Sequence, residues 1–412
     1  MPLPLTVYLD SSDISNLARP SVVNADSVAE IRHQFNELVQ QKKVTFPVSL
    51  IQILEIIHME EKHRELAIER AKVVKELSGG FALRWVSDLF FRDALAMLDI
   101  DIRNYNQHSV NEDGNWLPST INTEFKLISN LRNDIKTQLR DAATSRSERR
   151  QVDKLLFKGS RIRPKFAPLV DKALASVYEK LEQQLPVTER FKSDNLLLSL
   201  LLGRTTEQAV CRELMKGFCD PVYFISWYAD LFDKDRSVTG ALRRFASKIG
   251  DQINEVRAVV RTSPLPAQET KSAISAHRLD TAEFRARLIK DLFTNNKDTL
   301  KKAGVNSFLW RDSVVNSNRG ELQGIDTFLD ILGFTYQEDM STYSERGDVK
   351  DSAVADLMHA LYLPYVDLFR ADRSFAHRLK VAVPKYQLKV VTTLRELPAM
   401  IQTALTDAVR RE

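Results

Sequence analysis

The chain contains few cysteines, glycines and prolines, and these scarcities exclude several classes of protein. Cys211 and Cys219 are the only cysteines in 412 residues, which excludes a disulfide framework and a four-cysteine zinc site and favours a reducing compartment. There are only 13 glycines and 14 prolines, while hydrophobic residues make up 43% and charged residues 28% of the chain. This composition is typical of a helix-rich globular protein with enough apolar residues for a sizeable core.

Long apolar runs are also absent from the sequence. The most apolar stretch, Leu196–Leu202, falls far short of the ~20 residues needed to span a bilayer. No cationic segment leads into an apolar stretch near the start, so we predict neither a signal peptide nor a membrane segment, and we expect a cytoplasmic protein. The formal charge of +4 permits a polyanionic partner without requiring one.

The beginning of the chain carries a distinct pattern. Leu5–Leu9 is a short apolar run that ends on Asp10, Ser11 and Ser12. In a parallel α/β sheet, ligands are bound at the carboxyl ends of the strands. Asp10 is therefore a candidate site residue.

Strand and helix patterns alternate within residues 1–80. Leu5–Leu9 and Lys43–Val48 read as strands, and an amphipathic helix follows each of them. The second helix begins with the capping-box pattern Ser49–Gln52. Alternation of this kind implies parallel strands joined by right-handed crossovers.

The same alternation returns in residues 346–412. Here a helix precedes a strand over Tyr365–Phe369, and Leu388–Thr392 reads as a last strand. Residues 81–345 instead show amphipathic helical stripes with almost no strand signal. We therefore predict an α/β fold in which both ends of the chain build one domain around a central, mainly parallel sheet, with a large α-helical domain inserted at 81–345.

Three further acids occupy unusual local settings. Glu55 lies among apolar residues, Asp356 lies within a predicted helix, and Asp372 closely follows a strand as Asp10 does. Taken singly, each has an ordinary explanation, because an acid after a strand often caps a helix and an acid in a helix is usually solvated. Their order along the chain, together with the element in which each lies, gives stronger evidence for a shared site than any one acid does.

With these residues in view, the chain resembles a PIN domain, the metal-dependent nuclease fold. The resemblance lies in four segments of the two chain ends: Val7–Ser12, Val48–Glu55, Asp356–Phe375 and Leu388–Pro398. It does not extend to the middle of the chain, which is far longer than the corresponding part of a minimal PIN domain. The resemblance implies a three-layer PIN-like domain.

By the same resemblance, four acids would be catalytic and would bind Mg²⁺ or Mn²⁺. They are Asp10, Glu55, Asp356 and Asp372, with Ser11 or Ser12 assisting. Clustered carboxylates repel one another unless cations neutralise them, and these metals prefer oxygen ligands. A metal-activated water would hydrolyse a phosphodiester bond, with RNA as the expected substrate and DNA as the alternative.

The identity of the third acid has two alternatives. Asp348 and Asp351 lie just upstream of Asp356, and either could take its role. We prefer Asp356 because its short spacing to the strand before Asp372 matches the family better. Asp367 stands at the start of that strand, so we expect it at the opposite end of the sheet.

The most basic part of the chain lies within residues 132–165. Its candidate nucleic-acid-binding residues are Arg146, Arg149, Arg150, Lys154, Lys158, Arg161 and Arg163. Such a cluster can bind a phosphate backbone, although a charge run is often only a solvated surface. We also expect the inserted helical domain to offer a surface for a protein partner or inhibitor, and the oligomeric state stays open.

Two other functions compete with the nuclease hypothesis. The first is a non-catalytic protein whose PIN-like or other α/β core carries a helical interaction domain. The second is a helical ribonuclease of the HEPN type, suggested by the Arg-x4-His spacing of Arg103 and His108. The residues between these two are poor helix formers, so a chance match in a loop is the better interpretation.

Overall fold

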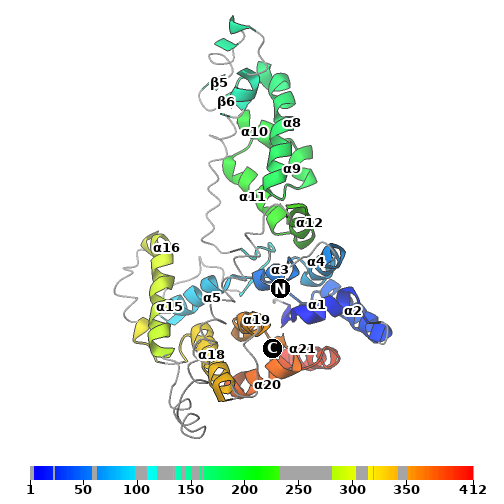
Figure 1. Ribbon diagram of the computed structural model, residues 1–412, viewed down its shortest axis with the longest axis vertical. Helices are drawn as coiled ribbons and strands as arrows, with labels where there is room; N and C mark the ends of the chain where they lie inside the picture. Colours follow the sequence, from blue (N-terminus) through cyan, green and yellow to red (C-terminus); the bar gives the residue numbers. More distant parts are fainter. Residues whose placement is uncertain are drawn as a thin grey trace, which may run out of the picture. The chain divides into compact units, whose positions relative to one another are not determined.

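The computed structural model describes most of the chain and divides it into two compact units. The described residues are 4–21, 24–57, 63–97, 109–117, 133, 135–140, 145–147, 149–150, 157–158, 161–231, 281–302, 314–318, 320–341 and 351–411. Unit 1 comprises Met1–Thr120 and Asp235–Glu412, and unit 2 comprises Ile121–Lys234. In Figure 1 the blue and the orange-red segments thus belong to one unit, and the green helices belong to the other.

The centre of unit 1 is a four-stranded, all-parallel sheet. Its strands, in spatial order, are β2 (Val44–Thr45), β1 (Leu5–Tyr8), β7 (Leu368–Arg370) and β8 (Val390–Val391). The two central strands come from opposite ends of the chain, with Tyr8 opposite Phe369. This confirms the predicted α/β fold and the parallel sheet built from both chain ends.

The helices of unit 1 come from three parts of the sequence. They are α1 (Ser11–Ala18), α2 (Ala25–Gln40), α3 (Leu50–Ile56), α4 (Arg64–Ser78), α5 (Val86–Met97), α15 (Thr281–Asn295), α16 (Lys297–Lys302), α18 (Gln323–Ser341), α19 (Asp351–Ala360), α20 (Arg373–Ala382) and α21 (Leu397–Arg411). Single turns η4 (Leu363–Tyr365) and η5 (Pro384–Tyr386) and the antiparallel pair β3 (Ala82–Leu83) and β4 (Val110–Asn111) complete it. The predicted capping box is present, because Ser49 Oγ accepts from the Gln52 amide and the Gln52 side chain accepts from the Ser49 amide.

One hydrophobic core joins the sheet to helices that the sequence pattern placed in the insertion. Phe90 of α5, Leu329 of α18 and Phe369 of β7 belong to the same buried cluster. The close approach of α18 depends on Gly324, where a Cβ would lie 2.0 Å from Tyr365 Oη and 2.6 Å from the Phe90 ring. Unit 1 therefore extends beyond the predicted boundaries at 81 and 345.

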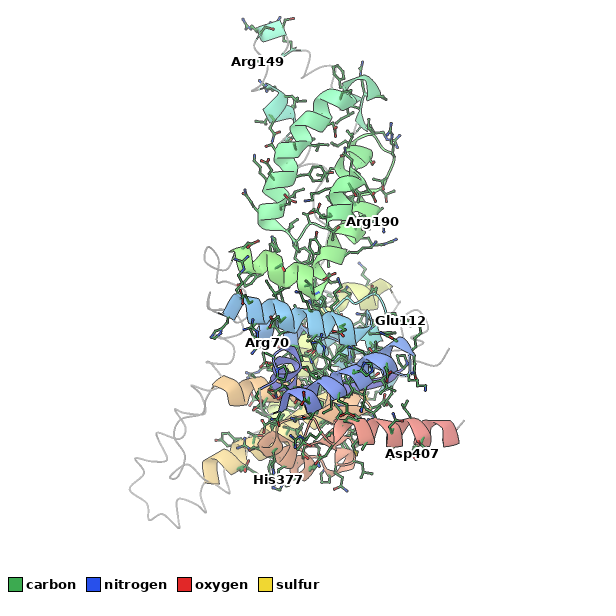
Figure 2. The ribbon with its side chains drawn as sticks, turned by 90° about the vertical axis from the view of Figure 1, so that its right-hand side faces the viewer. Arg70, Glu112, Arg149, Arg190, His377 and Asp407 are labelled. Atoms are coloured by element: carbon green, nitrogen blue, oxygen red, sulfur yellow. The ribbon has the colours of Figure 1, made fainter. Side chains whose placement is uncertain are left out.

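Unit 2 is a smaller, mainly helical body. Its elements are β5 (Phe157–Lys158), β6 (Arg161–Ile162), the single turn η3 (Pro164–Phe166), α8 (Ala167–Gln184), α9 (Glu189–Ser193), α10 (Leu196–Leu201), α11 (Glu207–Phe218) and α12 (Pro221–Leu231). Leu174, Phe191 and Leu197 are buried in its core, and Arg149 and Arg190 are exposed on its surface (Figure 2). In the described part of the chain, no helix has both the length and the apolar character that a bilayer crossing requires.

Candidate functional site

Asp10 and Asp372 occupy equivalent places at the centre of the sheet. Asp10 comes shortly after β1 and Asp372 comes shortly after β7, and these strands are adjacent and parallel. The chain proceeds from β1 to β2 on one side and from β7 to β8 on the other, so the strand order reverses between the two acids. In open α/β sheets, ligands bind in the crevice at the carboxyl ends of the strands where this reversal occurs.

Both aspartates also stand at the beginning of a helix. Asp372 Oδ1 caps α20 by accepting from the amides of Ser374 at 2.7 Å and Phe375 at 2.9 Å. Asp10 precedes α1 without a side-chain cap bond, and its Oδ2 instead accepts from the Ser12 hydroxyl. The capping explanation therefore applies to one oxygen of Asp372 and not to the side chain of Asp10.

Glu55 lies near the end of α3 and is held at one oxygen. Its Oε2 accepts from the Ser11 hydroxyl and, at 2.8 Å, from Nε2 of His359 in α19. Burial by itself would raise the pKa of Glu55, but the charge and hydrogen bond of His359 and the hydrogen bond of Ser11 outweigh it and lower the pKa. Glu55 is therefore stabilised as a carboxylate.

Asp356 stands one helical turn before His359 in α19 and is half-buried. Burial, followed by the negative charge of Asp372, raises its pKa to about 7; Asp10 and Glu55 act in the same direction, and His359 opposes them. The four predicted acids thus belong to one electrostatic neighbourhood although they come from distant parts of the sequence. Their mutual repulsion favours the protonated form of Asp356.

His359 is a residue of this cluster that the sequence pattern does not predict, and the structure places it beside Glu55 and Asp356. Its Nδ1 lies 2.5 Å from Tyr8 Oη, which in turn lies 3.0 Å from Ser49 Oγ. Burial would lower the pKa of His359, but the charge and hydrogen bond of Glu55 outweigh it and raise the pKa. The only local signal for this contact is its spacing of three residues from Asp356, which places both side chains on one helix face.

A buried ion pair ties the first turn of α1 to the end of β7. Arg370 Nη2 donates to Asp13 Oδ1 at 3.0 Å, and both side chains are buried. Burial raises the pKa of Asp13 to about 7, although Arg370 acts to lower it. Because Asp10 precedes α1 and Asp372 follows β7, this pair helps to fix the two candidate acids relative to each other.

Arg70, on α4, adds a positive charge near Glu55. It is half-buried, and its Nε is buried and has no hydrogen-bond partner among the described residues. Figure 2 labels Arg70 on the ribbon. Burial lowers the pKa of Arg70, whereas the charge of Glu55 acts to raise it. Arginine binds anionic groups such as phosphates, so Arg70 is a candidate anion-binding residue beside Glu55.

The four acids have the donor chemistry of a magnesium or manganese site without its coordination geometry. Within the described ranges, no three His, Cys, Asp or Glu side chains are grouped so as to hold a metal ion. Carboxylate oxygens are the ligands that these cations prefer, and a cation would relieve the repulsion that raises the pKa of Asp356. The residue types therefore fit a metal, although the described side chains are not grouped closely enough to form a complete metal site.

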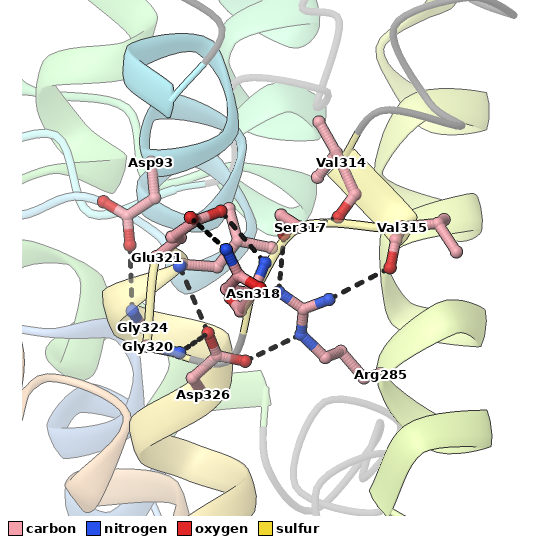
Figure 3. Close-up of polar contacts among 11 residues, drawn as sticks. Asp93, Arg285, Val314, Val315, Ser317, Asn318, Gly320, Glu321, Gly324 and Asp326 are labelled. Atoms are coloured by element: carbon pink, nitrogen blue, oxygen red, sulfur yellow. Dashed lines mark hydrogen bonds and ion pairs between the residues drawn. The ribbon is translucent and has the colours of Figure 1, made fainter.

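A second cluster of buried polar residues in unit 1 has a structural role, which is to join neighbouring segments (Figure 3). Arg285 Nε donates to Asp326 Oδ1 at 2.8 Å, and its two other nitrogens donate to residues of the 314–318 segment. Asp326 Oδ2 accepts from the amide of Gly320 at 2.7 Å. Both side chains are buried and hydrogen-bonded, so this pair ties α15 to the start of α18.

The other predicted site residues are distributed as follows. Ser12 is exposed, Asp351 begins α19 with a side chain outside the described part, and Asp348 lies outside the described residues. In unit 2, Arg146, Arg149, Arg150 and Arg161 are exposed and Arg163 is half-buried; Lys158 lies in β5 with its side chain outside the description, and Lys154 lies outside the described residues. Arg103 and His108 also lie outside the described residues.

Known proteins give no guide to this chain. Comparisons with protein-family models, curated proteins and solved structures found no match in any of the three. The function must therefore be inferred from the carboxylate cluster and its surroundings.

Proposed function

We propose that the protein is a PIN-like, Mg²⁺- or Mn²⁺-dependent nuclease that hydrolyses phosphodiester bonds, with RNA as its substrate. The observation that carries the proposal is the placement of Asp10 and Asp372 beyond adjacent parallel strands where the strand order reverses. Glu55 and Asp356 share the electrostatic neighbourhood of these two acids. The parallel sheet flanked by helices from both chain ends supports a three-layer PIN-like arrangement.

The metal would be held by Asp10, Glu55, Asp356 and Asp372. When bound, it would supply positive charge to the phosphate and acidify the water that attacks it. The protein groups around the acids have separate tasks: Ser11 and His359 orient Glu55. Burial and the neighbouring acids raise the pKa of Asp356 to about 7, and a bound cation would favour its charged form.

Each unit, taken by itself, carries positive charge that suits an anionic polymer. In unit 1, Arg70 offers a guanidinium beside Glu55 for a phosphate of the substrate. In unit 2, the exposed Arg149, Arg150 and Arg161 suit the sequence-independent contacts that proteins make with a nucleic-acid backbone. Both features support an anionic polymer as the substrate.

The test is cleavage of mixed RNA and single-stranded DNA by the full chain with Mn²⁺. We expect Asp10→Asn and Asp372→Asn to lose more than about 100-fold in rate, because even an outer partner of a metal ligand costs about 10–100-fold when removed. The matched control is Asp26→Asn, an exposed acid in the first turn of α2, which should cleave like the wild type. Equal activity of all four proteins would exclude these acids from the chemistry, and an inactive wild type would count against the enzyme.

A second candidate is a non-catalytic PIN-like protein in which the acids serve the fold. It is favoured by the capping role of Asp372 and by the ion pair between Glu55 and His359, since both interactions stabilise structure without chemistry. Calorimetric titration with Mn²⁺ separates the two candidates. A nuclease requires binding that Asp10→Asn weakens, whereas the scaffold protein would give no binding heat.

A further inference from the structure

A buried chain of hydrogen bonds leads from the core of unit 1 to the candidate site. It runs from Ser49 through Tyr8 and His359 to Glu55, and Ser11 meets the same carboxylate. Ser49, Tyr8 and His359 are buried, so these polar groups are shielded from water. Four elements contribute: helix α3 with its N-cap residue Ser49, strand β1, helix α19 and helix α1.

Polar side chains cost free energy when they are buried, and this cost suggests that the hydrogen-bonded chain serves the site at its outer end. Burying an imidazole and a hydroxyl requires that each finds a partner, and an apolar side chain of similar size would avoid that requirement. The inner end reaches Ser49, the buried N-cap residue of α3. The outer end terminates on Glu55, whose side chain is 23% exposed whereas that of His359 is 5% exposed.

The contacts at the outer end fix the orientation of one carboxylate. Ser11 and His359 both donate to Oε2 of Glu55, and no hydrogen bond in the described part of the chain uses Oε1. Tyr8 holds the other ring nitrogen of His359 and stacks on Phe369 at 5.0 Å, so the imidazole cannot rotate freely. One oxygen of Glu55 is thereby anchored to the core while the other stays available.

We propose that His359, held by Tyr8, is a positioning residue that keeps Glu55 oriented for metal binding. This inference rests on the proposed function, because it assigns Glu55 to the metal. Outer-shell partners of metal-ligating side chains act in this way, and removing one typically reduces metal affinity or activity by about 10–100-fold. Neither His359 nor Tyr8 need touch the metal or the substrate.

The test is the Mn²⁺ affinity of the full chain, measured by calorimetry, together with RNA cleavage by the same proteins. We expect His359→Ala to weaken Mn²⁺ binding by about 10–100-fold and His359→Gln to recover much of the loss, because the glutamine amide can still donate to Glu55. Tyr8→Phe should weaken binding less than His359→Ala. All variants are checked for folding by circular dichroism.

The structure offers a matched control for Tyr8. Tyr362 is also fully buried, stacks on Tyr8 at 5.5 Å, and its hydroxyl has no hydrogen-bond partner among the described residues. Tyr362→Phe therefore removes the same atom from the same core without touching the chain, and it should leave Mn²⁺ affinity unchanged. Equal effects of the two substitutions would point to general softening of the core and would overturn the proposal.

A double-mutant cycle shows whether His359 acts through Glu55. In a Glu55→Gln background, His359→Ala should cause no further loss of Mn²⁺ affinity; a second full loss would overturn the inference. If the wild type binds Mn²⁺ without cleaving nucleic acid, the nuclease proposal is rejected, and the Mn²⁺ affinities of the variants still test the positioning role of His359. If the wild type cleaves and His359→Ala binds Mn²⁺ and cleaves normally, only the positioning role of His359 is rejected. If the wild type does not bind Mn²⁺, both the metal-dependent nuclease and the positioning role are rejected.

Discussion

Asp372 has a structural task that is independent of any chemistry. Its Oδ1 caps α20, while no hydrogen bond from the described residues reaches its Oδ2. Asp10 stands at the same place relative to α1 and yet makes no cap bond. A helix cap and a ligand can thus share one carboxylate, and the local sequence gives no means of separating these roles.

Asp13 makes the stability of the fold depend on pH. The ordinary pKa of an aspartate is 3.8, and burial raises that of Asp13 to about 7. Between these values the folded state holds the proton more tightly than the unfolded state does. The stability that this group contributes is therefore fully present below the lower value and is lost as the pH rises through about 7.

We expect Asp13→Asn, which cannot ionise, to lose less stability than the wild type between pH 4 and pH 8. The difference should be on the order of a few kcal/mol, measured as the free energy of unfolding in urea at several pH values. Asp26→Asn, which alters an exposed acid, should follow the wild-type curve. Parallel curves for Asp13→Asn and the wild type would show that Asp13 ionises normally in the folded protein.

The sequence predicts the acids of the candidate site, but it does not predict the residues that form hydrogen bonds with them. Asp10, Glu55 and Asp372 each follow or interrupt an apolar pattern that is visible locally. The contact of His359 with Tyr8 joins residues 351 positions apart, and it depends on the tertiary fold. No periodicity in either segment predicts which partner a buried histidine will find.

At the scale of the elements, the strands are shorter than their apolar patterns. The apolar pattern predicts a strand over Lys43–Val48, and β2 covers only Val44–Thr45. Leu388–Thr392 similarly yields β8 at Val390–Val391. An apolar run indicates that a segment is buried, whereas a strand also needs a neighbouring strand to pair with. The sequence therefore predicts where these strands lie but not how long they are.

Helix α18 provides a test of packing with a control in the same helix. A Cβ at Gly324 would approach Tyr365 Oη to 2.0 Å and Phe90 to 2.6 Å, whereas at Gly333 its nearest contact would be 3.8 Å away. We expect Gly324→Ala to destabilise the protein by about 1–3 kcal/mol through overpacking. Gly333→Ala should be neutral or should stabilise by up to about 1 kcal/mol, since alanine favours a helix.

Thermal and urea unfolding of the two glycine variants measure this difference. Because both substitutions add one methyl group to the same helix, helix propensity alone predicts the same sign for both. A stabilising Gly324→Ala would mean that α18 does not lie as close to η4 and α5 as the structure places it.

At the scale of the whole molecule, the main prediction from sequence was that the two chain ends meet. The pairing of β1 with β7 confirms it, and the return of strand-and-helix alternation near the end of the chain was the signal. The boundaries of the inserted helical domain are harder to predict from the sequence than the meeting of the two chain ends. Helices α5, α15 and α18 share the core of the sheet, and an amphipathic pattern shows that a face is buried without showing against what.

The central claim is that Asp10 and Asp372, brought together by that pairing, help to bind a divalent metal. Anomalous diffraction from crystals of the full chain grown with Mn²⁺ tests it most directly. The account predicts a manganese peak in contact with the carboxylates of both residues, and loss of that peak in Asp10→Asn. Crystals that hold Mn²⁺ elsewhere, or none at this end of the sheet at saturating concentration, would contradict the claim.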